Sequence, residues 1–251
     1  KTDLSKVLDV VEHLDVLPTP AHEQIIMLLG TDKIIGLPEA ERLPLWTKLI
    51  NLVSKHRKFA DTKWAMNPDQ VNKIEEISKK LEPSSPTLRY KRLFSEREFD
   101  LYEGKDNWQE QAQKLNLRRQ EAIKEIFDKG SINAVFEFAN IVESPRRVGI
   151  AFGMIAKSDV DQLILPKLLE NEKKAFEQLA GGFVLGRYST RGWHWVDQLD
   201  AIRWKPIQIG QLLAYLPFNP ETWERSARFL GENETPYWVK IAPNPLEAGD
   251  N

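Results

Sequence analysis

The chain contains no cysteine. That excludes disulfide bonds, thiolate nucleophiles and cysteine-ligated zinc, and it favours a reducing, cytoplasmic location. Neither sign of charge dominates: 35 Lys and Arg stand against 37 Asp and Glu, so we expect neither a strongly basic nucleic-acid-binding protein nor a polybasic membrane module. No apolar run reaches the roughly 18 residues that a membrane-spanning helix needs. The sequence therefore predicts a protein that functions away from membranes.

The signature motifs of catalytic sites are missing too. There is no G-x-x-x-x-G-K-[ST] phosphate-binding loop, no G-x-S-x-G nucleophile elbow and no H-E-x-x-H zinc motif. We therefore expect a protein that is not an enzyme and that binds neither a cofactor nor a metal ion. Five glycines lie in helical context and indicate close helix packing rather than dinucleotide binding. They are Gly149, Gly153, Gly181, Gly182 and Gly186.

Signals for β-strands are absent. No window alternates apolar and polar residues over six or more positions, and no Asn-Gly or Asp-Gly hairpin turn occurs. Apolar residues instead recur at helical spacing, which predicts an all-α protein. One helix is expected from Asn67-Pro68 to about Leu81, and another from Asp106 to Gly130. We expect Gly130 to end this second helix in the left-handed conformation. Further helix starts are expected at Ser144-Pro145, Ser158, Asn219-Pro220 and Thr235-Pro236.

The proline-containing stretch 82–86 is the single candidate boundary inside the chain. We expect an N-terminal helical segment over residues 1–82, a linker and lead-in over 83–105, and a C-terminal helical-repeat region over 106–251. Short helices joined by tight turns favour an irregular α-solenoid of stacked helical hairpins, like HEAT or tetratricopeptide arrays. An irregular globular helical domain is the alternative, because the helix starts have no fixed period.

The stretch 176–199 joins an apolar, glycine-containing helix to a segment rich in arginine and aromatic residues. Tryptophan, tyrosine and arginine are the usual anchors of protein interfaces, so we predict a partner-binding surface here. Its candidate residues are Arg187, Tyr188, Arg191, Trp193, His194 and Trp195. For each tryptophan taken singly, core packing is the favoured interpretation. His194 could also act as a general base oriented by Asp197, although a histidine that satisfies a loop carbonyl explains it more simply.

Several other side chains have a simpler structural interpretation. Trp46, Trp64 and Trp108 fall at core spacing. His13 and His56 are expected at the surface, and His22 either at a helix cap or at the surface. Asp159 and Asp161 are expected to complement the dipole at a helix N-terminus.

Basic and aromatic residues alternate in the segment 89–97. Arg89, Lys91 and Arg92 flank Tyr90, a pattern that single-stranded nucleic-acid grooves use. A solvated helix face explains the same residues, and it is the preferred interpretation. Nucleic acid is therefore not an expected partner.

The segments FVLGRYSTRGWHWV (183–196) and LLAYLPFNPETWERSARFLGENETPYWVKI (212–241) give the chain a family resemblance. With their spaced aromatics and proline-headed helices, they resemble the helical-repeat region of large prokaryotic multidomain NTPases of the signal-transducing STAND type. Some of these act in antiviral defence. The resemblance covers about the last 150 residues and implies a sensor array that binds a ligand protein. The NTPase and effector parts of that family are missing from this chain.

Together these observations predict a non-catalytic helical-repeat module for protein–protein interaction. Because the chain begins with Lys rather than Met, we expect it to be part of a longer bacterial protein. The resemblance makes it the ligand-sensing region of an antiviral STAND-type NTPase, with a phage protein or other domains of the parent chain as partner. A purely structural scaffold within a larger enzyme is the alternative.

Overall fold

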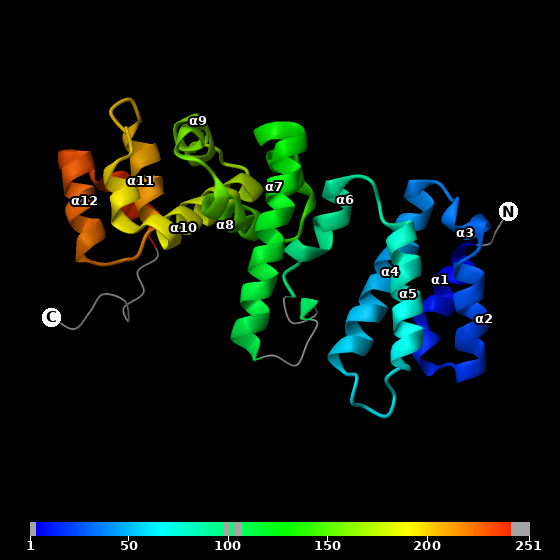
Figure 1. Ribbon diagram of the computed structural model, residues 1–251. Coiled ribbons are helices and arrows are strands. Elements are labelled where there is room, and N and C mark those ends of the chain that lie inside the picture. The colour runs from blue at the N-terminus through cyan, green and yellow to red at the C-terminus, as the bar shows by residue number, and fades with distance from the viewer. Residues whose placement is uncertain (1–3, 98–100, 103–106, 242–251) are drawn as a thin grey trace. The chain divides into compact units, whose positions relative to one another are not determined.

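The computed structural model describes residues 4–97, 101–102 and 107–241. Every regular element in these ranges is a helix, so the predicted all-α class is confirmed (Figure 1). None of the described helices is both long and apolar enough to cross a membrane. The chain divides into two compact units: unit 1 comprises residues 1–89 and 97–115, and unit 2 comprises residues 90–96 and 116–251.

Unit 1 is built mainly from two pairs of helices whose apolar faces meet in one core. The predicted helix start at Asn67 is confirmed: the Asn67 side chain accepts a hydrogen bond from the Asp69 backbone N–H at 2.9 Å. Leu14, Leu29, Leu45 and Leu49 are completely buried in the core. The helices are α1 (Leu4–Glu12), α2 (Thr19–Leu29), α3 (Asp32–Ile35), α4 (Glu39–Lys58), α5 (Pro68–Leu81) and α6 (Pro86–Tyr90).

Unit 2 contains a short 3-10 helix (Lys91–Phe94), most of the long helix α7 (Trp108–Ile141) and all later helices. The predicted helix starts at Ser144-Pro145, Ser158, Asn219-Pro220 and Thr235-Pro236 are confirmed, whereas the predicted capping residue Asp106 lies outside the described residues. The Asn219 side chain caps α12 by accepting from Thr222 N–H at 3.1 Å. The later helices are α8 (Pro145–Ile155), α9 (Ser158–Leu169), α10 (Lys174–Asp197), α11 (Pro206–Ala214), α12 (Pro220–Leu230) and α13 (Thr235–Lys240).

Two of the long helices of unit 2 are interrupted by the same backbone geometry. In α7 the break falls at Ser131 (φ 57°, ψ −159°), and in α10 at Gly192 (φ 58°, ψ −154°). The prediction that Gly130 takes the left-handed conformation is wrong, because its φ is −141°. The positive φ falls on the serine that follows, which redirects the chain between the two halves of α7.

Glycines bring α8 and α10 into direct backbone contact. A Cβ on Gly149 would overlap the Leu179 carbonyl oxygen, and a Cβ on Gly186 would overlap the Ile150 carbonyl oxygen. Gly153 and Gly182 make reciprocal approaches of the same kind. The predicted close packing is therefore confirmed. Because later residues of α8 meet later residues of α10, the two helices run parallel, with α9 between them in sequence.

Four of the predicted side-chain placements are wrong. His56 and His22 are buried, because the Nδ1 atom of each ring has a partner inside unit 1: Met66 N–H for His56 and the Gln70 side chain for His22. Trp64 and Trp108 are exposed rather than in the core. Asp159 and Asp161 lie in the first turn of α9 as predicted, and Asp161 is in addition buried. Trp46 and His13 lie where they were predicted.

Candidate functional site

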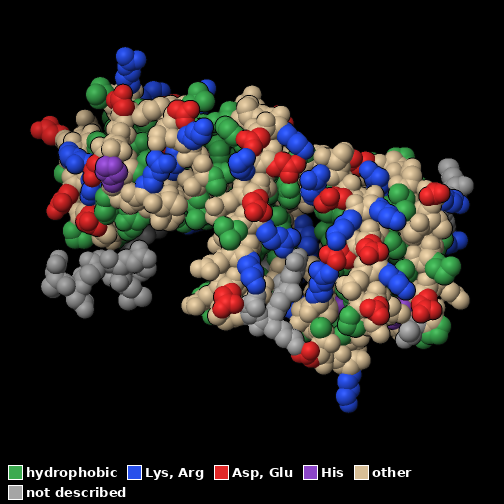
Figure 2. Space-filling model, in the orientation of Figure 1, with side chains coloured by type: hydrophobic (Ala, Val, Ile, Leu, Met, Phe, Trp, Pro, Cys, Tyr) green, Lys and Arg blue, Asp and Glu red, His purple; other side chains and the backbone are tan. Residues whose placement is uncertain are grey.

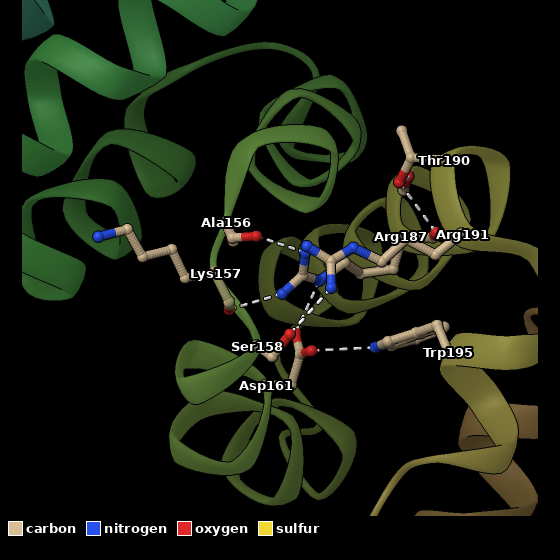
Figure 3. Close-up of polar contacts among 9 residues, drawn as sticks. Ala156, Lys157, Ser158, Asp161, Arg187, Thr190, Arg191 and Trp195 are labelled. Atoms are coloured by element: carbon tan, nitrogen blue, oxygen red, sulfur yellow. Dashed lines mark hydrogen bonds and ion pairs between the residues drawn. The ribbon is translucent and has the colours of Figure 1, made fainter.

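The predicted site begins with an arginine that lies inside the protein. The Arg187 side chain is 0% exposed, and its Nε donates to Asp161 Oδ1 at 2.7 Å. Its two terminal nitrogens donate to the backbone carbonyl oxygens of Ala156 and Lys157, where the chain passes from α8 to α9 (Figure 3). Each of the three guanidinium nitrogens thus has an acceptor, which offsets the cost of burying the charge.

Asp161 also binds the second buried member of the predicted set. The Trp195 indole N–H donates to Asp161 Oδ2 at 2.9 Å, so one carboxylate joins residues on both sides of the kink at Gly192 (Figure 3). A partner that docks on the folded surface would reach neither Arg187 nor Trp195. Their prediction as direct partner contacts is therefore wrong, because their polar atoms are satisfied inside unit 2.

Tyr188 and Trp193 form a different arrangement, in which aromatic rings meet at the surface. Their ring centroids lie 4.9 Å apart with an edge-to-face angle of 69°. The Trp193 indole N–H donates to Glu221 Oε2 on α12 at 2.7 Å, and the Arg225 guanidinium lies 4.2 Å from the Trp193 ring centroid. Both aromatic side chains stay partly exposed. Contacts with α12 therefore hold the ring of Trp193 in place.

Asp197 completes this group by binding two arginines of α12. Its carboxylate accepts from Arg225 Nε and Nη2 at 3.0 and 2.7 Å and also pairs with Arg228. Hydrogen bonds from Arg225 hold the pKa of Asp197 below its usual 3.8, with a further contribution from Arg228. We call the group made of Tyr188, Trp193, Asp197, Glu221, Arg225 and Arg228 the Trp193 cluster.

Burial raises the pKa of the Tyr188 phenol, and the neighbouring Glu221 carboxylate raises it further. Tyr188 is thus neutral at physiological pH, and its hydroxyl can donate a hydrogen bond. The cluster therefore offers a neutral phenol, an indole edge and a stacked guanidinium on one part of the surface. These are the groups that dominate binding energy in protein interfaces.

Arg191 and His194, the last two predicted residues, are exposed. Arg191 donates to the Ser158 hydroxyl at 2.9 Å. The His194 ring makes no hydrogen bond with any residue in the described ranges, and Asp197 is bound by arginines instead. The hypothesis of a His194–Asp197 general base thus finds no supporting contact.

The basic segment predicted as a nucleic-acid alternative is divided between the two units. In unit 1, Arg89 forms an ion pair with Glu82 at 3.5 Å and donates to the Pro83 carbonyl oxygen. Lys91 and Arg92 belong to unit 2, where Lys91 is exposed. Neither unit by itself presents these three cations as one surface. On the face drawn in Figure 2, acidic and basic side chains are interspersed.

The sequence-based prediction missed the α12 side of the cluster. Glu221, Arg225 and Arg228 recur at spacings of four and three, which places them on one face of a helix, and this signal was available. Their contact with Trp193 could not be read from spacing, because it depends on how α12 packs. Within the described ranges no group of three or more His, Asp and Glu side chains could hold a metal ion.

Comparison with known proteins adds no relative. The scan against protein-family models, the search of curated proteins and the search of solved structures each found no match.

Proposed function

We propose that this chain is a non-catalytic helical module for protein–protein interaction, with its binding surface at the Trp193 cluster and the neighbouring Arg191 and His194. The observation that carries the proposal is the half-buried Trp193, placed between Arg225 and Tyr188 and hydrogen-bonded to Glu221. A preordered Trp–Arg–Tyr group loses little side-chain entropy on binding, so more of its contact energy appears as affinity.

The helix arrangement supports the finer proposal of stacked hairpins. In an α-solenoid, equivalent helices of successive hairpins run parallel, with one antiparallel helix between them in sequence. The parallel packing of α8 on α10, with α9 between them in sequence, fits that pattern.

The resemblance of residues 183–196 and 212–241 to STAND-type proteins supports a more specific role. On that basis we propose a cytoplasmic, ligand-sensing region of a bacterial antiviral NTPase, with a phage protein as ligand. The Trp193 cluster lies within these two segments, except for Asp197, which directly follows the first segment at the end of α10.

The test is capture with matched variants. The wild-type chain, Trp193→Ala, Arg225→Ala and the control Trp108→Ala are used as bait in lysates of phage-infected and uninfected bacteria. We expect a phage protein captured by the wild type and the control. Loss of a central anchor should weaken the purified complex at least about tenfold in titration calorimetry.

Two results would contradict the proposal. Equal affinity of Trp193→Ala and wild type, with both folded by circular dichroism, would move the binding surface elsewhere. If the folded wild-type chain captures no protein, the alternative of a structural scaffold that acts only within its parent protein is favoured.

A further inference from the structure

The last residues of α10 form a short helical segment after the kink at Gly192. We call residues 193–197 the post-kink segment. Gly192 has φ 58° and ψ −154°, so the chain changes direction here and the packing of α8 on α10 does not set the direction of this segment. At 1.5 Å per residue it is only about 7.5 Å long, and much longer helices are marginal by themselves in water. Its orientation therefore depends on the contacts that its side chains make with other helices.

Those contacts go to two different helices. Trp193 and Asp197 are four residues apart, so they share one face, and both bind side chains of α12. Trp195 follows Trp193 by two residues, which is about 200° around a helix. Its indole N–H donates to Oδ2 of Asp161 on α9 at 2.9 Å. The post-kink segment is thus held from α9 on one side and from α12 on the other.

The side chain of Asp161 is itself fixed in the core. Its Oδ1 accepts from Arg187 Nε at 2.7 Å, and the other guanidinium nitrogens of Arg187 bind backbone carbonyl oxygens between α8 and α9 (Figure 3). Asp161, Arg187 and Trp195 are 2%, 0% and 4% exposed. Arg187 precedes the kink and Trp195 follows it. One buried carboxylate therefore connects the two halves of α10.

A carboxylate is the group that this position requires. The N–H groups of Arg187 and Trp195 point at separate oxygens of Asp161, and both are donors. An asparagine side chain has one acceptor oxygen, so its NH₂ group would face one of these two donors. The chemistry of Asp161 thus matches a residue that holds both sides of the kink at once.

We propose that Asp161 is the positioning residue of the Trp193 cluster. By binding Trp195 it fixes the post-kink segment, and the segment holds the Trp193 ring beside Arg225. Without this bond the segment pivots at Gly192, where a Cβ would meet no atom within 4 Å. The inference rests on the proposed function and deepens it, because it names the buried contact that controls the order of the binding surface.

A purely structural role for Asp161 makes a different prediction. If α12 alone holds Trp193, the bond between Asp161 and Trp195 stabilises unit 2 but does not affect the surroundings of Trp193 in the folded chain. The two accounts therefore differ in the native state, before any unfolding.

The test uses Trp195→Phe in the full chain, because this variant removes the indole donor and leaves the ion pair of Asp161 with Arg187. The chain is labelled with ¹⁵N-tryptophan, and Trp193→Phe identifies the indole signal of Trp193 by its loss. We expect this signal to shift in folded Trp195→Phe. Its N–H should also exchange with solvent at least about tenfold faster, as loss of a hydrogen bond to a charged group predicts.

Two control variants keep the result specific. Trp204→Phe replaces another buried tryptophan of unit 2, and Val135→Ala destabilises unit 2 from α7, which contributes no residue to the contacts above. Neither control should move the Trp193 signal, and circular dichroism checks that every variant is folded.

The proposal is overturned if folded Trp195→Phe keeps the Trp193 signal and exchange rate of wild type, or if Val135→Ala changes them equally. The measurement needs no partner. Failure to capture a protein from lysate would thus count against the proposed function and leave this result unchanged.

Discussion

Asp161 is the residue on which the packing of α9 against α10 depends most directly. Its two carboxylate oxygens accept separately from Arg187 and Trp195, and all three side chains are buried. A buried ion pair of this kind is expensive to break, because the remaining charge is left without a partner.

Asp161→Asn should therefore lower the free energy of unfolding by about 3–5 kcal/mol, since Arg187 keeps its charge in the core. The measurement is urea unfolding followed by tryptophan fluorescence. Asp159→Asn, at an exposed position two residues earlier on the same helix, is the control and should cost at most about 1 kcal/mol. Equal effects of the two substitutions would show that the buried contacts are not formed.

Ser131 has a backbone conformation that glycine adopts at far lower cost. Its φ of 57° and ψ of −159° nearly repeat those of Gly192, where no side chain has to be accommodated. Ser131→Gly should thus raise the free energy of unfolding by roughly 1 kcal/mol, measured as a higher melting temperature. Gly192→Ala should lower it by a similar amount, although nothing lies within 4 Å of the added Cβ. A lower melting temperature for Ser131→Gly would contradict this account.

At the scale of the elements, α8 and α10 touch through backbone atoms. Gly182→Ala would force a methyl group against the Arg146 carbonyl oxygen, which cannot rotate away. We expect a loss of about 3 kcal/mol or more, at or above the upper end of overpacking costs. Gly181→Ala is the matched control, because its Cβ would meet the Tyr215 ring at 2.9 Å, and that side chain can shift. Thermal unfolding should rank Gly181→Ala well above Gly182→Ala in stability.

The contact between α10 and α12 has a pH dependence whose sign follows from Asp197. Its pKa is lower in the folded chain than its usual 3.8, so the folded state favours the carboxylate. The resulting stabilisation is fully present above the ordinary pKa and is lost as pH falls through the lower folded pKa. Wild type should therefore melt higher than Asp197→Asn at pH 7, and the difference should shrink as the pH falls below 3.8. A constant difference across this range would argue against the ion pairs with Arg225 and Arg228.

At the scale of the whole molecule, the chain consists of two compact units. The core of unit 1 forms from α1, α2, α4 and α5, whereas Asp161, Arg187 and Trp195 all belong to unit 2. A destabilising substitution in one core should therefore leave the amide hydrogens of the other core protected from exchange. In hydrogen exchange, Asp161→Asn should accelerate exchange in α8, α9 and α10 but leave α4 and α5 unchanged. Uniform acceleration through both units would indicate a single cooperative structure.

Local signals in the sequence predicted much of this protein. Capping residues and proline at the first helical position located the starts of α5, α8, α12 and α13, because these effects act within one turn of the chain. The glycines between residues 149 and 186 also predicted a close contact between helices, because only a residue without a Cβ permits such an approach. The absence of alternation and hairpin turns gave the all-α class.

The candidate site was only half predictable. The stretch that contains Tyr188 and Trp193 was identified from its composition, but Arg187 and Trp195 share that composition and lie in the core. No feature of the neighbouring sequence distinguishes the buried pair, Arg187 and Trp195, from the surface pair, Tyr188 and Trp193. The kink at Gly192 and the position of Asp161 on α9 determine which side chains turn inward.

The sequence by itself determined the helical class, most helix starts and the tight packing of α8 on α10, because each depends on neighbouring residues or on the absence of a side chain. Only the tertiary structure decided which arginine is buried and which stacks on Trp193. It also decided that Trp64 is exposed beside lysines while His56 is buried. Burial and partner choice depend on residues far apart in the chain, and those distances are set only when the helices pack.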